Sequence, residues 1–317
     1  MRIAAVDIGG TSIKFGIWDG EKIVEWNERP SLAREGGVQL IRRVQTILQH
    51  CGKFDALGIS TAGQVDINNG SIYYANANIP NYTGMKVKSI LEERFKVPVF
   101  VENDVNAAAL GEAQFGAGRD VSDFLCLTYG TGIGGAIVIN RQIYRGSRWS
   151  AGSFGGILVH PEDLKAELDF SGCYENYASV TALIRKARRI DDSLADGRAI
   201  FASINRKEVR CVVEQWIDEI VYGLVTLVHV FNPPKVILGG GIMEQKFIST
   251  EVRQKLLSFV SPGMRRTEVV RAQLGNKAGF LGVAHEAEKL LKKISKIWMK
   301  NNSYQNNRKS KKKGKYI

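Results

Sequence analysis

Two segments of the chain share one arrangement of strands and turns, and this repetition constrains the fold more than any other feature. Each segment contains an apolar run, a glycine-rich turn and two further runs joined by a short turn, at residues 3–26 and 124–145. In the first segment Asp19-Gly20 separates two apolar runs, which is a strong hairpin signal. Two common supersecondary units could coincide by chance. However, turn position and hairpin order both match at a spacing of about 120 residues, which favours an internal duplication.

Apolar periodicity places helices and strands alternately after each of these segments. The predicted helices are 37–50, 85–95, 105–115, 180–189, 209–231 and 279–296, and the predicted later strands are 56–60, 98–101 and 236–238. Antiparallel strands followed by alternating helices and strands are typical of a layered α/β fold. A length of 317 residues is sufficient for about two domains.

The positive charge of the chain is concentrated at its C-terminal end. The formal net charge is +12, from 44 Lys and Arg against 32 Asp and Glu. From Lys289 onward there are eleven basic residues and no acidic one, so 12 − 11 leaves +1 for residues 1–288. Residues 299–317 have almost no apolar content, which predicts a basic disordered tail. We expect this tail to be an inert solvated extension. Its alternative role is weak, salt-sensitive contact with nucleic acid or anionic lipid.

The chain has no feature typical of a secreted or membrane-bound protein. The four cysteines lie far apart without a CxxC pair, and Asp7 interrupts the first apolar run, unlike in a signal peptide. No run approaches the roughly 20 apolar residues of a membrane span. These observations predict a soluble, cytoplasmic protein without membrane association.

Three glycine-rich turns follow predicted strands and are candidates for binding phosphate. They are Gly9-Gly10-Thr11 after Asp7, Gly130-Thr131-Gly132, and Gly239-Gly240-Gly241. Glycines allow backbone N–H groups to approach an anion closely, a threonine hydroxyl adds a donor, and Asp7 could orient hydrated Mg²⁺. One such turn alone would indicate a plain hairpin. Three together predict nucleotide binding, with the first two facing each other across a cleft.

Asp104 is the candidate general base. It lies in Val101-Glu102-Asn103-Asp104, where a predicted strand ends and a helix begins. Asn103 or Asp104 could therefore serve only as a helix N-cap. A carboxylate at a strand end opposite phosphate-binding loops is also where a base for an attacking hydroxyl would lie.

The sequence resembles the ROK family of sugar kinases and related repressors, within the actin-like, ribonuclease-H-fold ATPase superfamily. The matching segments run in order from Arg2 to about Glu288: DIGGTSIK at 7–14, ANIPNYTG at 77–84, VENDVNAAALGE at 101–112, LTYGTGIGGAIVINRQIYRG at 127–146, GCYENYASV at 172–180, ILGGGI at 237–242 and GNKAGFLGVA at 275–284.

The resemblance implies two ribonuclease-H-like lobes around a central cleft. The first would comprise residues 1–115 plus about 284–298, and the second 116–283. ATP and Mg²⁺ would bind at Asp7, Gly9, Gly10, Thr11, Lys14, Gly130, Thr131, Gly132 and Gly239–Gly241. The sugar would contact Gly63, Asn78, Asn103, Asp104, Ser153 and Glu175. Asp104 would remove the proton from a sugar hydroxyl, typically the one at carbon 6, and a homodimer is also expected.

Two departures from the family pattern affect the expected sugar and zinc sites. Where the family has Gly-Glu-x-Gly-His, this chain has Ser153 and Gly156 in place of the Glu and the His. The family's zinc motif falls on Ala166, Leu168, Asp169, Gly172 and Cys173, so one of three thiols remains. We therefore predict no structural zinc, and we expect His160 to be a solvated or core histidine.

The lost carboxylate and imidazole should weaken binding of a plain monosaccharide by about 10–100-fold. The space at Gly156 could accept a substituent, as in a β-glucoside or an N-acetylhexosamine.

Two other functions are alternatives to a sugar kinase, and residues of the sequence argue against each of them. A catalytically weak or inactive sugar or nucleotide sensor is motivated by Ser153 and Gly156; retention of Asn103, Asp104 and the glycine turns argues against it. A DNA-binding repressor of the same family would carry an N-terminal helix-turn-helix, and the first phosphate turn begins too early, at Asp7, to leave room for one.

Overall fold

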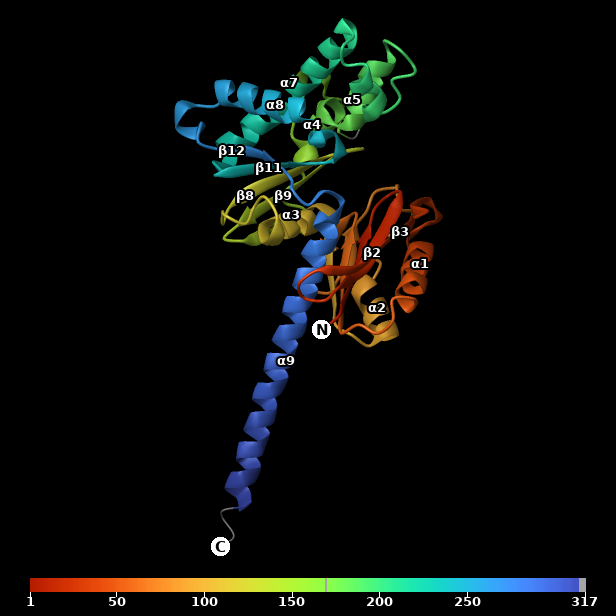
Figure 1. Ribbon diagram of the computed structural model, residues 1–317, viewed down its shortest axis with the longest axis vertical. Coiled ribbons are helices and arrows are strands. Elements are labelled where there is room, and N and C mark those ends of the chain that lie inside the picture. The colour runs from red at the N-terminus through yellow and green to blue at the C-terminus, as the bar shows by residue number, and fades with distance from the viewer. Residues whose placement is uncertain (169, 314–317) are drawn as a thin grey trace. The chain divides into compact units, whose positions relative to one another are not determined.

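The computed structural model describes residues 1–168 and 170–313, with backbone alone from residue 301 onward. Within it the chain forms two compact units, one of Met1–Ala107 with Phe280 onward and one of Ala108–Gly279 (Figure 1). The sequence analysis placed these divisions at residues 115 and 284. The structure places them inside one helix and near the start of another, where no loop or change of composition marks a boundary.

Unit 1 is built on a five-stranded sheet in the order β3-β2-β1-β4-β7. The strands are β1 Ile3–Ile8, β2 Ser12–Trp18, β3 Ile23–Pro30, β4 Ala56–Thr61 and β7 Val99–Asn103. The first three are antiparallel neighbours, whereas β4 pairs in parallel with both β1 and β7. A separate hairpin joins β5 (Gln64–Asp66) to β6 (Ser71–Tyr74).

Helices cover both faces of this sheet. Helices α1 (Gly37–Gln49) and α2 (Val87–Phe95) lie on one side in Figure 1, and α1 buries an apolar stripe that includes Leu40 and Val44. Helix α9 (Ala278–Lys313) packs on the other face. There a Cβ added to Gly58 of β4 would overlap the Val283 carbonyl, so only glycine permits this close approach.

Unit 2 repeats the same sheet in the order β10-β9-β8-β11-β12. Its strands are β8 Phe124–Tyr129, β9 Ile133–Ile139, β10 Gln142–Tyr144, β11 Lys235–Gly239 and β12 Glu268–Arg271. As in unit 1, three strands (β8, β9 and β10) are antiparallel neighbours, and β11 pairs in parallel with both β8 and β12. The predicted repetition of the strand–turn–hairpin unit is confirmed, as is the α/β class with two lobes.

The core of unit 2 forms around α7 (Lys207–Phe231), which buries Trp216, Ile220 and Leu224 completely. Figure 1 shows α7 and α8 (Lys246–Phe259) on one side of the sheet and α3 (Asp104–Phe115) on the other. The other α-helices of this unit are α4 Tyr174–Ala178, α5 Val180–Arg188 and α6 Gly197–Ala202.

The C-terminal segment differs from the sequence-based expectation. The predicted last helix ends at residue 296 and is followed by disorder, whereas α9 continues through Lys313. Extending an existing helix avoids the cost of nucleation, and the lysines and Arg308 of this segment have good helix propensity, so low apolar content alone did not decide the backbone conformation. Residues 314–317 of the predicted tail lie outside the described residues. Among the residues that are described, no helix has the length and apolarity needed to cross a membrane.

Candidate active site

The central carboxylate of unit 1 is Asp7, near the end of β1. Its neighbour in the sheet on one side is Lys14 of β2, and on the other side it is Ser60 of β4. The Ser60 hydroxyl donates a hydrogen bond to Asp7 Oδ1 at 2.5 Å. Burial raises the pKa of Asp7, while the Ser60 hydrogen bond and the Lys14 charge act in the opposite direction. Two of the predicted nucleotide-site residues, Asp7 and Lys14, are thus adjacent.

Asp104 begins α3 directly after β7, and its backbone position is fixed by a helix cap. Asn103 Oδ1 accepts hydrogen bonds from the N–H groups of Val105 at 3.0 Å and Asn106 at 3.1 Å. The capping role that the sequence left open between two residues therefore belongs chiefly to Asn103. Asp104 Oδ1 accepts from Val105 N–H at 2.9 Å and from Asn103 Nδ2 at 2.8 Å, and Oδ2 takes part in neither bond.

The environment of Asp104 favours its protonated form. Burial raises its pKa to about 6, the negative charge of Asp7 adds to this, and the bonds from Val105 and Asn103 partly oppose it. A carboxyl group with a pKa near 6 is mostly ionised at neutral pH, yet binds a proton far more readily than an ordinary aspartate. It therefore has the properties of a general base.

Asn103 connects Asp104 to a second predicted substrate residue. Its Nδ2 donates to the Gly63 carbonyl at 3.0 Å. Gly63 has a φ of +97°, and a Cβ there would lie 2.9 Å from the Tyr74 carbonyl oxygen, so glycine is required. Asn78 lies in an exposed loop, where its N–H bonds to Asn76. The structure brings Gly63, Asn103 and Asp104 together, and no described hydrogen bond joins Asn78 to them.

The sequence analysis missed two buried polar residues beside this cap. Glu102 Oε1 accepts from Asn103 N–H at 3.0 Å and from Asn106 Nδ2 at 3.2 Å. Asn106 Oδ1 is the one buried side-chain oxygen or nitrogen without a hydrogen-bond partner among the described residues. Polar residues flanking Asn103 and Asp104 on both sides were a signal that could have identified this network.

The first glycine turn is folded tightly against its own strands. Gly9 N–H donates to the Ser12 carbonyl at 2.9 Å, and a Cβ on Gly9 would lie 3.1 Å from the same oxygen. Ser31 Oγ donates to the Gly10 carbonyl at 2.8 Å, and Ser31 N–H to that of Thr11 at 3.0 Å. Because the carbonyl groups of Gly10 and Thr11 accept hydrogen bonds from Ser31, the backbone of this turn is held in place without a ligand.

Unit 2 brings the other two glycine turns together, because Thr128 at the end of β8 pairs with Gly239 at the end of β11. A Cβ on Gly240, where φ is +104°, would overlap the Tyr129 carbonyl. The start of α5 supports the other turn: Val180 N–H donates to the Gly130 carbonyl at 2.9 Å, and Thr181 Oγ1 to that of Thr131 at 2.8 Å.

Each of the three turns contains one glycine that internal packing does not require. A Cβ added to Gly10, Gly130 or Gly241 would meet no protein atom within 4 Å, and none of these residues has a positive φ. The space beside each is therefore open to a bound group. Each turn by itself therefore suits a ligand group that lies against the backbone, as a phosphate group does.

Glu175 of α4 holds the second turn in place. Its Oε2 accepts from Ile133 N–H at 2.8 Å, and a Cβ on Gly132 would overlap this carboxylate. Ser153 is exposed, with its hydroxyl bonded to the Ser150 carbonyl at 2.7 Å. A Cβ on Gly156 would be in ordinary van der Waals contact with Phe170, at 3.7 Å, so packing does not require glycine there.

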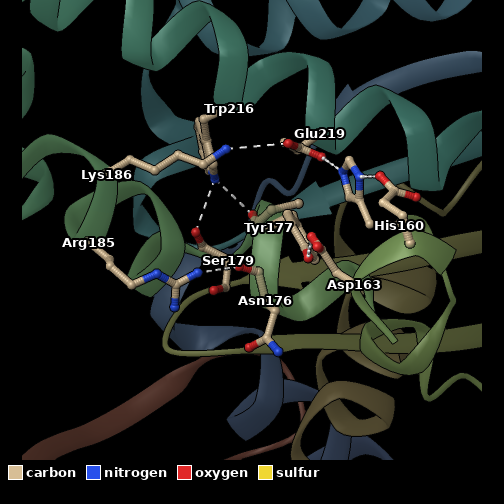
Figure 2. A network of polar contacts seen from close by, with 11 residues as sticks. His160, Asp163, Asn176, Tyr177, Ser179, Arg185, Lys186, Trp216 and Glu219 are labelled. Carbon is tan, nitrogen blue, oxygen red and sulfur yellow. Dashed lines mark hydrogen bonds and ion pairs between the residues drawn. The ribbon is translucent and has the colours of Figure 1, made fainter. Parts of the chain in front are cut away.

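His160 links the loop before α4 to α7, as Figure 2 shows. Its Nδ1 lies 2.9 Å from Glu162 and its Nε2 lies 2.8 Å from Glu219, which also pairs with Lys186 at 3.3 Å. Its ring lies against that of Tyr177 with centroids 4.1 Å apart. The expectation of a simply solvated or core histidine was wrong, because the residue bridges two carboxylates. Spacing along the chain gave no sign of Glu219.

The predicted loss of zinc concerns this same loop. Of the positions to which the family's zinc motif maps, Asp169 lies outside the described residues, and Cys173 is a free cysteine. Among residues 1–168 and 170–313, no group of three or more His, Cys, Asp or Glu side chains is arranged to hold a metal ion.

Known proteins resemble this chain over nearly its whole length. The model of the ROK family matches residues 3–289. A β-glucoside kinase from Listeria innocua is 32% identical over 295 residues, which cover 90% of this chain and 97% of the relative.

Two solved structures, each 30% identical, have a similar fold. A glucokinase from Streptomyces griseus in complex with glucose and AMPPNP gives a TM-score of 0.79 and covers 91% of this chain and 100% of that one. A Listeria monocytogenes protein provisionally assigned as an N-acetylmannosamine kinase gives 0.83, with 91% and 99% covered. The family indicated by the sequence motifs is confirmed: this chain belongs to the ROK family.

Proposed function

We propose that this chain transfers the γ-phosphoryl group of ATP to a sugar hydroxyl, that of carbon 6, with Asp104 as the general base. The observation that carries the proposal is the state of Asp104: its carboxyl group follows β7, Asn103 fixes it through Oδ1, and its pKa is about 6. The kinase relatives support the same reaction class.

The base acts through its free oxygen. Asn103 and Val105 N–H occupy Oδ1, so Oδ2 would accept the proton from the sugar hydroxyl. The charge of Asp7 strengthens the base, because it raises the pKa of Asp104. Asn103 is a positioning residue, since it bonds both Asp104 and the Gly63 carbonyl.

ATP would be held by the backbone of the glycine turns. The open positions at Gly10 in unit 1 and at Gly130 and Gly241 in unit 2 would each accept a phosphate group, because a side chain there would fill space that the protein leaves free. The N–H groups of these turns and the Thr11 and Thr131 hydroxyls would donate to phosphate oxygens, with Lys14 adding positive charge. Mg²⁺ bound near Asp7 would supply charge neutralisation during the transfer.

The sugar would carry a substituent. Gly156 stands where the family places an imidazole and Ser153 where it places a carboxylate, so the smaller side chains of this chain would leave room for a substituent. A β-glucoside or an N-acetylhexosamine would use this space, and Asn78 and Glu175 would contact sugar hydroxyls. Within the proposal, Glu175 therefore has two roles, because it also supports the Gly130–Gly132 turn.

The test is a coupled ADP-release assay over hexoses, N-acetylhexosamines and β-glucosides. We expect activity that depends on the sugar and is highest on a substituted one. The matched variant Ser153→Glu with Gly156→His restores the family residues, and should improve kcat/KM for plain glucose by about 10–100-fold. Sugar binding by calorimetry without turnover on any substrate would instead favour the sensor.

A further inference from the structure

The last described side chains of α9 form two opposite faces. At 100° per residue, Leu290, Leu291, Ile294, Ile297 and Trp298 fall within an arc of about 120°. The lysines fall on the opposite side of the helix; they are Lys289, Lys292, Lys293, Lys296 and Lys300. This part of α9 is therefore a basic amphipathic helix.

The apolar face is covered in its first part and uncovered in its second. Val283, Ala284 and Ala287 are buried against unit 1. Further along the same face, Ile294 is 43% exposed, Ile297 52% and Trp298 67%. A row of three large apolar side chains left in water at helical spacing differs from isolated exposed residues and marks a contact surface.

We propose that this segment of α9 binds the surface of an anionic lipid bilayer, with its apolar face among the acyl chains and its lysines at the headgroups. The charge pattern supports this partner, because eleven basic residues and no acidic one follow Glu288. A negatively charged bilayer satisfies both faces at once, and tryptophan is favoured at the boundary between headgroups and acyl chains. The helix lies on the membrane and does not span it.

Other partners satisfy only part of the surface. A second copy packed on the apolar face would leave the lysines, which lie on the opposite side, without a partner. Nucleic acid would leave Ile297 and Trp298 in water. Lys289 and Lys292 also form ion pairs with Glu286 and Glu288 of α9 itself, at 2.6 and 2.5 Å. Lys293 and Lys296, which lie between these pairs and Trp298, are therefore the ones to test.

The experiment is co-sedimentation of the full-length protein with vesicles of phosphatidylcholine, with or without phosphatidylglycerol. We expect binding only to the anionic vesicles, weakened by salt. Lys293→Gln and Lys296→Gln together should weaken it by about 10–100-fold. The double variant Ile294→Ser, Trp298→Ser should weaken it by about 10–100-fold.

The matched control is Val230→Ser with Phe259→Ser, which removes two apolar side chains that are 68% and 61% exposed in unit 2. It should bind like the wild type, and all variants should keep wild-type activity on a soluble sugar. Absence of binding at low salt would overturn the proposal. So would binding that the Ile294/Trp298 variant leaves unchanged, or a dimer in sedimentation velocity that this variant converts to monomer.

Discussion

Asp104→Asn should make the folded protein more stable while it slows the reaction strongly. The amide keeps Oδ1, so it can still accept from Val105 N–H and from Asn103. It removes the charge that is held in a buried position near Asp7. The substitution therefore removes the destabilisation that the buried negative charge causes, while it keeps the hydrogen bonds that Asp104 makes at the start of α3.

The size of the gain follows from the pKa of Asp104. A folded-state pKa of about 6 against the ordinary 3.8 means that the folded protein binds the proton more tightly than the unfolded chain. The ionised carboxylate therefore lowers the free energy of unfolding by roughly 3 kcal/mol above pH 7. The loss becomes smaller between the two pKa values and disappears below about pH 4. Removing this cost should raise the melting temperature by roughly 4–5 °C at pH 7.5.

The assay is thermal unfolding of wild type and variant from pH 4 to pH 8, together with kcat at pH 7.5. We expect the stability difference to disappear toward pH 4, and kcat to fall by about 10²–10⁴-fold. A variant that is no more stable than wild type at pH 7.5, or equally stabilised at pH 4, would refute the electrostatic reasoning.

Four further substitutions test other parts of the account. Asp7→Asn removes a charge that raises the pKa of Asp104, so the fall of kcat/KM on the acid side of its pH profile should move to lower pH. An unchanged profile would show that the charge of Asp7 does not affect the titration of Asp104. Gly130→Ala should leave the melting temperature unchanged and raise the KM for ATP about tenfold or more, whereas Gly240→Ala, with a positive φ and no space, should lower the melting temperature. Burial lowers the pKa of His160, but bonds to two glutamates raise it overall. His160→Gln should therefore cost about 1 kcal/mol below pH 6 and progressively less above pH 7, and a pH-independent loss in urea unfolding would contradict this.

The sequence predicted the elements with strong local signals. Apolar runs and the Asp19-Gly20 turn defined both hairpins, and the repeat implied two similar sheets, as found. Helix periodicity placed α7 close to its observed bounds. The unit boundary inside α3 was not predictable, because a helix that continues across a division changes neither periodicity nor composition.

Contacts between distant segments were not predictable in the same way. The bond of His160 to Glu219 joins residues 59 positions apart, and the bond of Glu175 to Ile133 N–H joins residues 42 apart. Such pairs depend on how loops pack on helices, which no local pattern encodes. By contrast, Asn103 and Asp104 were identified correctly as candidates for the cap because capping is a local interaction.

The central claim is transfer of phosphate from ATP to a sugar with Asp104 as base. The most direct measurement is a single-turnover experiment with ATP labelled at the γ-phosphate, comparing wild type with Asp104→Asn on the best sugar of the substrate panel. The account predicts labelled sugar phosphate from the wild type, and from the variant unimpaired ATP binding with transfer slowed by about 10²–10⁴-fold. Equal transfer rates in the two proteins would contradict it.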